Sequence, residues 1–426
     1  MRIPSEARLK DIYGTHLAEA KERYTHLIQM FEEHFPGQEA LFFTAPGRTE
    51  IIGNHTDHNG GKILAASVDM DTICAAQKTD DRIVTIVSEG YVPVTIDLDK
   101  LDEIPTCEGT LSLTAGILEG TVRRGFRAGG FNAFVTTQVV SAAGVSSSAS
   151  YEMMIGTVVN TLFNDGKMET ADIARIGRYA ENVWWEKASG LMDQMACGTG
   201  GCVLLDFDDR NGAGSVTCEA VDFSFEQIGY DILLINTGKG HADLSAAYSS
   251  IPNEMRMVAR ALAGEAVPAD EECNLCRFTE EEFLQRLPQI REAVSNDRAV
   301  LRAIHFYEET RRVEEAARAI KEGRAEMMPK LVEDSGSSSW RMLQNIFVDS
   351  EPQVQGIGVA LAAAEVWLKR EQAGSCRVNG GGFAGVIMCV VKKEKTADFA
   401  AYMAPLVGEE SICRIAIRET GAVCIG

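Results

Sequence analysis

A glycine followed by three serines, between an apolar stretch and a predicted helix, has the composition of an anion-binding loop. The run reads Ala142-Ala143-Gly144-Val145-Ser146-Ser147-Ser148-Ala149-Ser150. A helix that begins here presents unpaired backbone N–H groups and the positive end of its dipole. Gly144 allows close backbone approach to a phosphate, and the serine hydroxyls can donate to phosphate oxygens or reach a metal. The alternative is ordinary N-capping by serine, which needs only one of the three.

No GxxxxGK[ST] occurs in the chain, and the loop at 142–150 is not a GxGxxG, so the predicted phosphate loop is not one of the two common types. A carboxylate follows in the stretch GLMDQM, where Asp193 lies between apolar residues. Burial of an aspartate there is costly unless it has a partner, and the alternative is an N-cap of the next helix. Glu181 lies twelve residues earlier, on a helix predicted over 171–187.

Two further stretches concentrate polar or flexible residues between apolar segments. The first is TAPGRTEIIGNHTDHNGGKILAAS, residues 44–67, which brings an arginine, an aspartate and two histidines into one bend. The second is NGGGFAG, residues 379–385, whose glycines let backbone pack closely between strands. Glycine-rich strand ends also serve as simple turns, so the second stretch is weak evidence when taken alone.

The bulk composition limits the class of protein. A chain of 426 residues is expected to hold two domains. Its net charge of −21 argues against a nucleic-acid partner but allows an anionic small ligand in a local pocket. No apolar run reaches the length of a membrane span, and the first residues lack the apolar core of a signal peptide.

The 11 cysteines lie mostly in apolar runs, which is typical of reduced, buried thiols. The one CxxC, Cys273 to Cys276, has no second pair at zinc-site spacing, so reduced thiols are favoured over metal binding. We therefore expect a cytoplasmic protein.

The pattern of apolar residues indicates the elements that must position these motifs. It predicts a helix over 1–35, strands between 40 and 98, a helix over 109–124, a strand over 131–140 and helices through 163 and over 169–187. After a strand at 201–207 and a soft region at 208–216, a second unit holds strands, several helices between 241 and 369, a glycine-rich strand end, a helix and a last strand. Such a mixture predicts an α+β protein of two halves.

Four motifs in this order resemble those of the GHMP small-molecule kinases, and specifically the galactokinases. The stretch GRTEIIGNHTDHNGG is similar to the family signature GRVNLIGEHTDYNGG, and AGVSSSAS, GLMDQ and NGGGFAG are similar to GLSSSAS, GIMDQ and TGAGFGG. A further segment, HADLSAAY at 241–248, resembles a sugar-contacting segment of the family. The resemblance runs from about residue 40 to the end of the chain.

The resemblance implies a fold and a domain organisation. The expected fold has an N-terminal domain like domain 2 of ribosomal protein S5 and a ferredoxin-like C-terminal domain. We expect an N-terminal helical extension over 1–35, an N-terminal kinase domain with the phosphate loop over 36–215, and a C-terminal kinase domain over 216–426.

The resemblance also implies a reaction, in which ATP and Mg²⁺ phosphorylate the anomeric hydroxyl of a sugar, most simply galactose. Asp193 matches the proposed catalytic base, and Arg48 matches the residue that stabilises the transition state. Ser148 and Glu181 match the magnesium ligands. ATP is expected at Ala142, Ala143, Gly144, Val145, Ser146, Ser147 and Ser148, and the sugar at Asn54, His55, Asp57 and Tyr248. The expected partner is a small-molecule sugar, with no nucleic acid and no membrane, and the expected state is a monomer or weak homodimer.

The chain departs from the family pattern at several positions. Ala142 replaces a glycine of the phosphate loop, and SGSSSWR at 335–341 lacks a histidine common in the family. The largest departure is Asn54, where galactokinases carry a glutamate that accepts a hydrogen bond from a sugar hydroxyl; His58 also replaces a tyrosine. An amide both donates and accepts and carries no charge. This difference would weaken a galactose pocket about tenfold if nothing else changed.

Three hypotheses stay open at this point. The first is a galactose kinase, with a local substitution at residue 54 that nearby groups offset. The second is a kinase for a related sugar, such as galacturonate, N-acetylgalactosamine or arabinose, since an amide tolerates a carboxylate at C6. The third is a catalytically silent sensor of sugar and ATP, which the presence of Asp193, Arg48, Ser148 and Glu181 disfavours.

Overall fold

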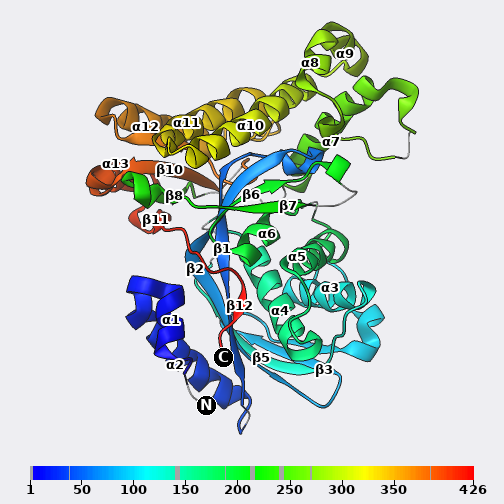
Figure 1. Cartoon of the computed structure of the whole chain (residues 1–426), viewed down its shortest axis with the longest axis vertical. Helices are drawn as coiled ribbons and strands as arrows, with labels where there is room; N and C mark the ends of the chain where they lie inside the picture. Colours follow the sequence, from blue (N-terminus) through cyan, green and yellow to red (C-terminus); the bar gives the residue numbers. More distant parts are fainter. Residues whose placement is uncertain are drawn as a thin grey trace.

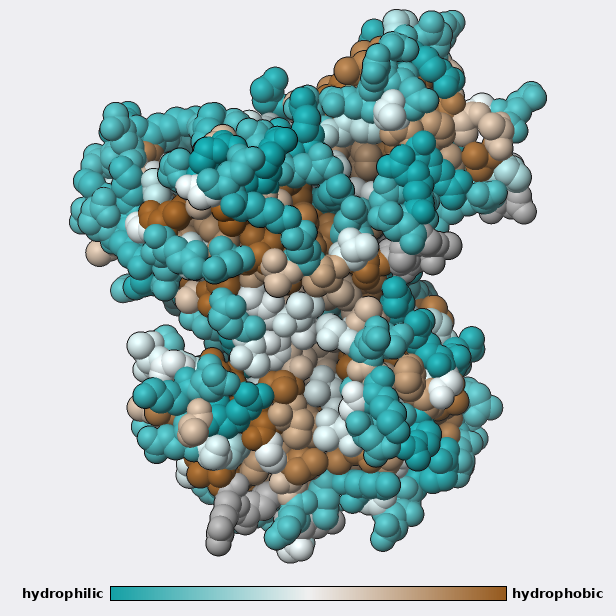
Figure 2. Space-filling view, in the orientation of Figure 1, coloured by the Kyte–Doolittle hydropathy of each residue, from teal (hydrophilic) through white to brown (hydrophobic). Residues whose placement is uncertain are grey.

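The chain forms two lobes that meet at a narrower waist (Figures 1 and 2). The computed structural model describes residues 3–37, 39–139, 144–187, 189–211, 216–238, 244–268, 271–383 and 385–426. An eight-stranded sheet has the path β12-β1-β2-β5-β3-β4, with β6 paired to β2 and β7 paired to β6. A four-stranded sheet has the order β11-β8-β10-β9.

Two long antiparallel strands, β1 (Leu41–Ile52) and β2 (Lys62–Lys78), run through the centre of the molecule (Figure 1). Both are buried along nearly their whole length, which fits their apolar sequences. The other strands of this sheet are β3 (Ile83–Ser88), β4 (Val94–Asp97), β5 (Phe131–Thr137), β6 (Cys202–Asp206), β7 (Thr217–Val221) and β12 (Val423–Cys424).

Helices cover both faces of the large sheet. One face carries α1 (Glu6–Tyr13) and α2 (Leu17–His34), because Tyr24, Leu27 and Phe31 lie on one side of α2 and are fully buried. The other face carries the helices that bear the phosphate loop and the carboxylates (Figure 1). They are α3 (Thr110–Arg123), α4 (Ser147–Asn164), α5 (Thr170–Tyr179) and α6 (Met192–Thr199).

The small sheet alternates its side chains between two apolar clusters. In β8 (Tyr230–Asn236), Leu233 and Ile235 pack with α12 (Gly356–Glu371) and α13 (Thr396–Val407), whereas Ile232 and Leu234 pack with α10 (Asp297–Lys321) and α11 (Met328–Ser338). The remaining strands are β9 (Gly374–Val378), β10 (Val386–Lys392) and β11 (Ile412–Ile415). A third cluster joins α7 (Ser245–Ala263), α8 (Glu280–Gln285) and α9 (Leu287–Val294) to α10.

A buried carboxylate links three distant segments of the chain. Asp71 of β2 forms ion pairs with Arg23 of α2 at 2.7 Å and with Arg418, beyond β11, at 2.6 Å. It also accepts hydrogen bonds from Tyr13 at 2.7 Å and Thr44 at 2.6 Å. Burial opposes ionisation, but the two arginines outweigh it and lower the pKa of Asp71 to about 2. These bonds fix α2 and the segment after β11 to the same sheet.

The α+β prediction is confirmed, and most of the predicted helices and strands correspond to those found. The helix expected over 1–35 is divided into α1 and α2, and β12, which follows the expected last strand, was not predicted. Membership of the sheets changes after β7, so residues 217–221 belong with the first sheet and not with the second unit that was expected to begin at 216. Strand β12 also returns to the first sheet, beside β1. Among the described residues, none of the helices combines the length and apolarity required to span a bilayer.

Candidate active site

The described part of the predicted phosphate loop, Gly144 to Ser148, leads directly into the N-terminus of α4. Gly144 has a φ of +69°, and a Cβ there would come within 2.8 Å of Val386, so the position requires glycine. Ser146 has a φ of +60° and makes no capping bond to its own helix. Its hydroxyl donates instead to Asp193. The predicted contacts Ala142 and Ala143 lie outside the described residues.

Arg48 and Asp193 form a bidentate pair beside this loop. Arg48 donates from Nε to Oδ1 at 2.7 Å and from Nη2 to Oδ2 at 2.6 Å, and its Nη1 donates to the Gly144 carbonyl at 2.9 Å. The pairing of β1 with β2 is irregular between Pro46 and Arg48, an irregularity of the kind that re-aims a side chain. Asp193 lies in the first turn of α6, where the helix dipole favours a negative charge.

The charges of this pair hold each other in the ionised state. Burial opposes ionisation of Asp193, but the charge and hydrogen bonds of Arg48, with the bond from Ser146, outweigh it and lower the pKa of Asp193. The pKa of Arg48 is raised by Asp193 although burial acts against it. Arg48 is only 7% exposed, and its pairing with Asp193 offsets the desolvation free energy that a single buried charge would carry.

Glu181 and Ser148, the two predicted magnesium ligands, lie in contact. Ser148 Oγ donates to Glu181 Oε1 at 2.8 Å, and Lys187 Nζ donates to the same oxygen at 2.6 Å. Gln194 Nε2 donates to Glu181 Oε2 at 3.1 Å. A π-helical turn over Ala180–Trp184 displaces Glu181 from regular helical geometry, as such turns often do at functional sites.

These groups fit a hard divalent cation. A hydroxyl and a carboxylate are oxygen donors of the kind that Mg²⁺ accepts alongside water and phosphate oxygens. The ammonium group of Lys187 lies on the carboxylate oxygen that would bind the ion, so a positive charge already occupies this position. Lys187 is half-exposed and can release the oxygen.

We expect Lys187→Met to bind Mg²⁺ more readily, because the ammonium competes with the ion for Glu181. A half-exposed ion pair contributes less than about 1 kcal/mol, which corresponds to a two- to fivefold lower half-saturating Mg²⁺ concentration. The measurement is a Mg²⁺ titration of nucleotide binding by calorimetry. Lys167→Met, at an exposed lysine paired with Asp165, is the matched control. An unchanged or higher half-saturating concentration in Lys187→Met would contradict this assignment.

The carbonyls of the glycine-rich loop, Gly380 to Gly382, hold three of the four predicted sugar-binding residues. Asn54 Nδ2 donates to the Gly380 carbonyl at 2.7 Å. His55 Nε2 donates to the Gly381 carbonyl at 2.9 Å, and the Tyr248 hydroxyl donates to the Gly382 carbonyl at 3.1 Å. A Cβ at Gly381 would come within 2.1 Å of the Tyr248 ring, so the aromatic ring packs directly on this backbone.

These bonds determine which hydrogen-bonding atoms of His55 and Tyr248 remain available to a ligand. Because the Gly381 carbonyl only accepts, the proton of neutral His55 is on Nε2 and its Nδ1 is an acceptor. Burial lowers the pKa of His55 to about 3, so the ring is neutral at physiological pH. Burial raises the pKa of Tyr248, whose oxygen keeps a lone pair. Both residues therefore present acceptors to a hydroxylated ligand.

Asp57 is the fourth predicted sugar-binding residue, and it lies against the segment that carries Asp193. Its Oδ1 accepts from the backbone N–H of His58 at 3.0 Å. A Cβ at Gly190, three residues before Asp193, would come within 1.7 Å of Asp57 Oδ2. The glycine of GLMDQ is thus required by the close approach of the Asp57 carboxylate.

Asn54, which is predicted to contact the sugar, has its amide bonded within the protein. Its side chain is fully buried, and both ends of the amide have partners within the protein. Nδ2 donates to Glu50 as well as to Gly380, and Oδ1 accepts from Asn345 Nδ2 at 2.8 Å and from Ser339 Oγ at 3.3 Å. In this conformation both the donor and the acceptor atom of the amide are engaged within the protein.

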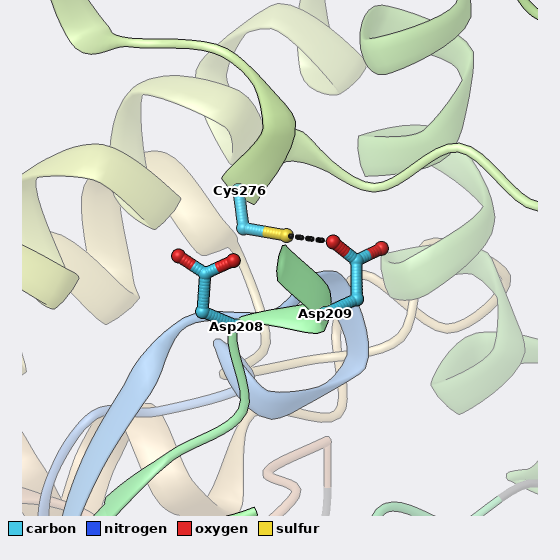
Figure 3. A group of neighbouring side chains, drawn as sticks. All are labelled: Asp208, Asp209 and Cys276. Carbon is cyan, nitrogen blue, oxygen red and sulfur yellow. Dashed lines mark hydrogen bonds between the residues drawn. The ribbon is translucent and has the colours of Figure 1, made fainter. Parts of the chain in front are cut away.

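A second group of possible metal ligands lies near the loop between β1 and β2 (residues 53–61, here the sugar loop) but is already paired. Asp208, Asp209 and Cys276 approach one another, and Cys276 Sγ donates to Asp209 Oδ1 at 3.3 Å (Figure 3). Arg210 donates to both oxygens of Asp208, and Arg277 donates to Asp209 at 3.2 Å. Two arginines therefore neutralise the two carboxylates, and the group is an ion-pair cluster.

Sequence reasoning missed several residues of the site. Lys187, Gln194 and Glu152 complete the surroundings of Glu181, since Gln194 Nε2 also donates to Glu152 Oε2 at 2.8 Å. Gln194 could have been identified from the sequence, because it is the last residue of the motif GLMDQ. Two serines of SGSSSWR support the sugar loop. Ser339 donates to Asn54 directly, and Ser335 donates to Glu309, which accepts from the Gly53 N–H. Their run at 335–339 was a signal that received no role.

Two family models match the chain. The galactokinase galactose-binding signature matches residues 29–78, and the GHMP kinase N-terminal domain matches residues 113–201. Together these segments include Arg48, the sugar loop, the phosphate loop, Glu181 and Asp193.

Curated relatives and solved structures agree with these models. A galactokinase of Actinobacillus pleuropneumoniae is 28% identical over 407 residues, 93% of this chain and 96% of that protein. A galactokinase of Clostridium beijerinckii is 27% identical over 364 residues, 84% and 86% of the two chains. The structure of Lactococcus lactis galactokinase complexed with galactose superposes with a TM-score of 0.78 at 23% identity, covering 94% of this chain and 99% of that one. Mevalonate kinase of Methanococcus jannaschii superposes with a TM-score of 0.60 at 14% identity, covering 91% and 100%.

Proposed function

We propose that the chain is a member of the galactokinase family of GHMP kinases and that it transfers the γ-phosphoryl group of ATP to the anomeric hydroxyl of galactose. The observation that carries this proposal is the bidentate pair of Arg48 and Asp193 beside Ser146 of the phosphate loop. Phosphoryl transfer depends on positioning and on charge stabilisation more than on covalent help from the protein. The pair supplies an acceptor for a hydroxyl and a cation for the phosphoryl group at one point.

Asp193 has one lone-pair direction left for the sugar hydroxyl. An ionised carboxylate offers about four acceptor directions. Arg48 uses one on each oxygen, and Ser146 uses a second on Oδ2, so the free direction lies on Oδ1. Because its pKa is lowered, Asp193 is a weak base. We propose that it orients the hydroxyl in line and receives the proton late, when the bond to phosphorus has begun to form.

Arg48 has two parts in this mechanism. It keeps Asp193 ionised, and its guanidinium stabilises the negative charge that develops on the transferring group. Its Nη1 also bonds the Gly144 carbonyl, which fixes the phosphate loop relative to Asp193. Ser148 and Glu181 would hold magnesium, which supplies positive charge to the ATP phosphates when bound.

The sugar is proposed to lie against His55, Asp57 and Tyr248. His55 Nδ1 and the Tyr248 oxygen are acceptors, and Asp57 Oδ2 faces the Gly190 backbone close to Asp193. A ring of acceptors suits a ligand rich in hydroxyl donors and is unfavourable for an anionic sugar. The burial of Asn54 removes the argument for galacturonate, which required the amide to contact C6.

An assay of ADP release with a panel of sugars tests the proposal. We expect galactose to give a kcat/KM above those of glucose, galacturonate, N-acetylgalactosamine and arabinose, and ³¹P NMR to identify a sugar 1-phosphate. Faster turnover of another sugar would keep the reaction and overturn the substrate. No turnover with any sugar, together with thermal stabilisation by ATP and galactose, would overturn the kinase in favour of a sensor. A cytoplasmic location and a monomer or weak homodimer remain predictions.

A further inference from the structure

Residues 50 and 54 of this chain are exchanged relative to the family signature. The signature GRVNLIGEHTDYNGG has an asparagine at the first position and a glutamate at the second. The corresponding stretch GRTEIIGNHTDHNGG has Glu50 and Asn54. The change at residue 54 is therefore accompanied by the opposite change four residues earlier, and the pair keeps one carboxylate and one amide.

The two exchanged side chains are in direct contact. Asn54 Nδ2 donates to Glu50 Oε1 at 3.1 Å and lies 3.3 Å from Oε2. Glu50 is 2% exposed and pairs with Arg377, which is fully buried. Burial raises the pKa of Glu50, although Arg377 acts in the opposite direction. The amide thus forms part of the hydrogen-bond shell of a buried ion pair.

The same amide joins the sugar loop to the other half of the molecule. It donates to the Gly380 carbonyl and accepts from Asn345, which also donates to the Gly381 carbonyl at 3.2 Å. The partners come from segments 285 to 326 residues further along the chain. One buried side chain therefore contacts Glu50 of β1, the π-helical turn Ser339–Leu343 with Asn345 beyond it, and the glycine-rich loop.

The backbone at this point is held from a third side by α10. His305 Nε2 donates to the Asn54 carbonyl at 2.8 Å. Glu309 Oε1 accepts from the N–H of Gly53 at 3.0 Å and from that of Asn54 at 3.4 Å. Both side chains are fully buried, so water does not replace these bonds. The backbone at residue 54, in the loop that carries His55 and Asp57, is therefore held by two buried side chains of α10.

We infer that Asn54 is a positioning residue, which fixes His55 against the glycine-rich loop, holds in place the loop that carries Asp57, and does not contact the sugar. The exchange with Glu50 preserves this connection, because the amide supplies donors to two neighbouring acceptors, Glu50 and the Gly380 carbonyl. A carboxylate at residue 54 has no hydrogen to donate and would face both acceptors in a buried environment. The kinetic part of this inference rests on the proposed function, and the structural part does not.

The inference predicts that a return to the family residue is harmful. Asn54→Glu would bury a second carboxylate beside Glu50, and its extra methylene would enter a filled site. Asn54→Asp keeps the size and the acceptor end but removes both donors. If residue 54 instead bound the sugar as a glutamate does in the family, Asn54→Glu would increase the kcat/KM for galactose.

Kinetics of Asn54→Asp test the positioning role. We expect the kcat/KM for galactose to fall about 10- to 100-fold, while the KM for ATP changes less than about twofold. The matched control is Asn160→Asp, at a buried asparagine that bonds both backbone groups of Met168 and lies on α4. The control is expected to lose thermal stability without a selective change in the KM for galactose. If both variants changed the KM and kcat/KM for galactose equally, Asn54 would contribute only to stability, and the positioning role would be refuted.

A thermodynamic cycle tests the exchange without any assay of activity. Asn54→Glu alone is expected to lower Tm by roughly 5–10 °C, because it leaves an unpaired buried charge. Glu50→Asn alone leaves Arg377 without its partner and is also expected to lower Tm. The double variant Glu50→Asn/Asn54→Glu restores one carboxylate and one amide, and its loss should be smaller than the sum of the two single losses.

The two experiments separate failure of this inference from failure of the proposed function. Additive losses of Tm in the cycle, or a gain in galactose turnover by Asn54→Glu, would overturn the positioning role even in an active kinase. If the wild-type protein phosphorylates no sugar, the proposed function fails, and non-additive losses in the cycle would still support the connection through residue 54.

Discussion

Asp193→Ala is expected to lower kcat about 10³-fold, the largest effect of any single substitution considered in this protein. The substitution removes the acceptor for the sugar hydroxyl and leaves the Arg48 guanidinium without its bidentate partner. Nucleotide binding should stay nearly intact, because the bond from Arg48 Nη1 to the Gly144 carbonyl still holds the phosphate loop when the Asp193 carboxylate and its bond from Ser146 are removed. Initial rates of ADP release and calorimetric titration with a non-hydrolysable ATP analogue measure the two quantities.

The control for this variant is Asp172→Ala, at a carboxylate on α5 that pairs with Arg124 at 3.1 Å. This partly exposed pair contributes little, so kcat should remain within about twofold of the wild type. Retention of most of the turnover by Asp193→Ala would refute the assignment of this residue. A comparable loss of nucleotide affinity would instead place Asp193 in the phosphate loop's own structure.

Arg48→Met is the second substitution with a large expected effect, a fall in kcat of about 10²- to 10³-fold. The thioether chain fills part of the volume of the arginine but cannot bond Asp193 or the Gly144 carbonyl. Arg48→Lys restores the charge without the bidentate geometry, so we expect it to recover only part of the lost rate. A full recovery by lysine would show that charge alone is required at this position.

The pH dependence of the same variants gives a second readout. In the wild type the pKa of Asp193 is lowered below its usual 3.8, so Asp193 is ionised throughout the neutral range. The stabilisation by its pairing is therefore present above pH 3.8 and is lost as the pH falls through the lowered pKa. In Arg48→Met, burial is opposed only by the bond from Ser146 and the charge of Lys187, and the pKa of Asp193 rises. The acid limb of kcat/KM should move to higher pH in this variant, and an unmoved limb would contradict the pairing.

Local sequence patterns predicted much of the fold because they depend on nearby residues. The apolar period over 109–124 corresponds to α3, and the apolar run at 131–140 contains β5. The motif containing Asp193 was identified because an aspartate between methionines requires a partner. That partner is Arg48, 145 residues away, and the family resemblance, not the spacing, brought the two together before the structure did.

The remaining features depend on tertiary contacts that a single sequence does not reveal. Whether Asn54 faces a sugar or Asn345 is decided by a contact across 291 residues. The π-helical turn at 180–184 leaves no mark in the apolar period, yet it sets the direction of Glu181. From the sequence, glycines 380–382 could be a simple turn. Their carbonyls accept hydrogen bonds from Asn54, His55 and Tyr248, which are distant in the sequence, so this role is visible only in the structure.

The Asp71 ion-pair network imposes an order on the biosynthesis of this protein. Arg418, one of the two cations that neutralise this buried carboxylate, is translated 347 residues after it. At about 5–20 residues per second, the ribosome needs roughly 20–70 s to cover this interval. During that time Arg23 is the only arginine partner of Asp71 already made, and the large sheet lacks β12. The Asp71 network and the large sheet are therefore complete only after Arg418 and β12, at the end of the chain, have been translated.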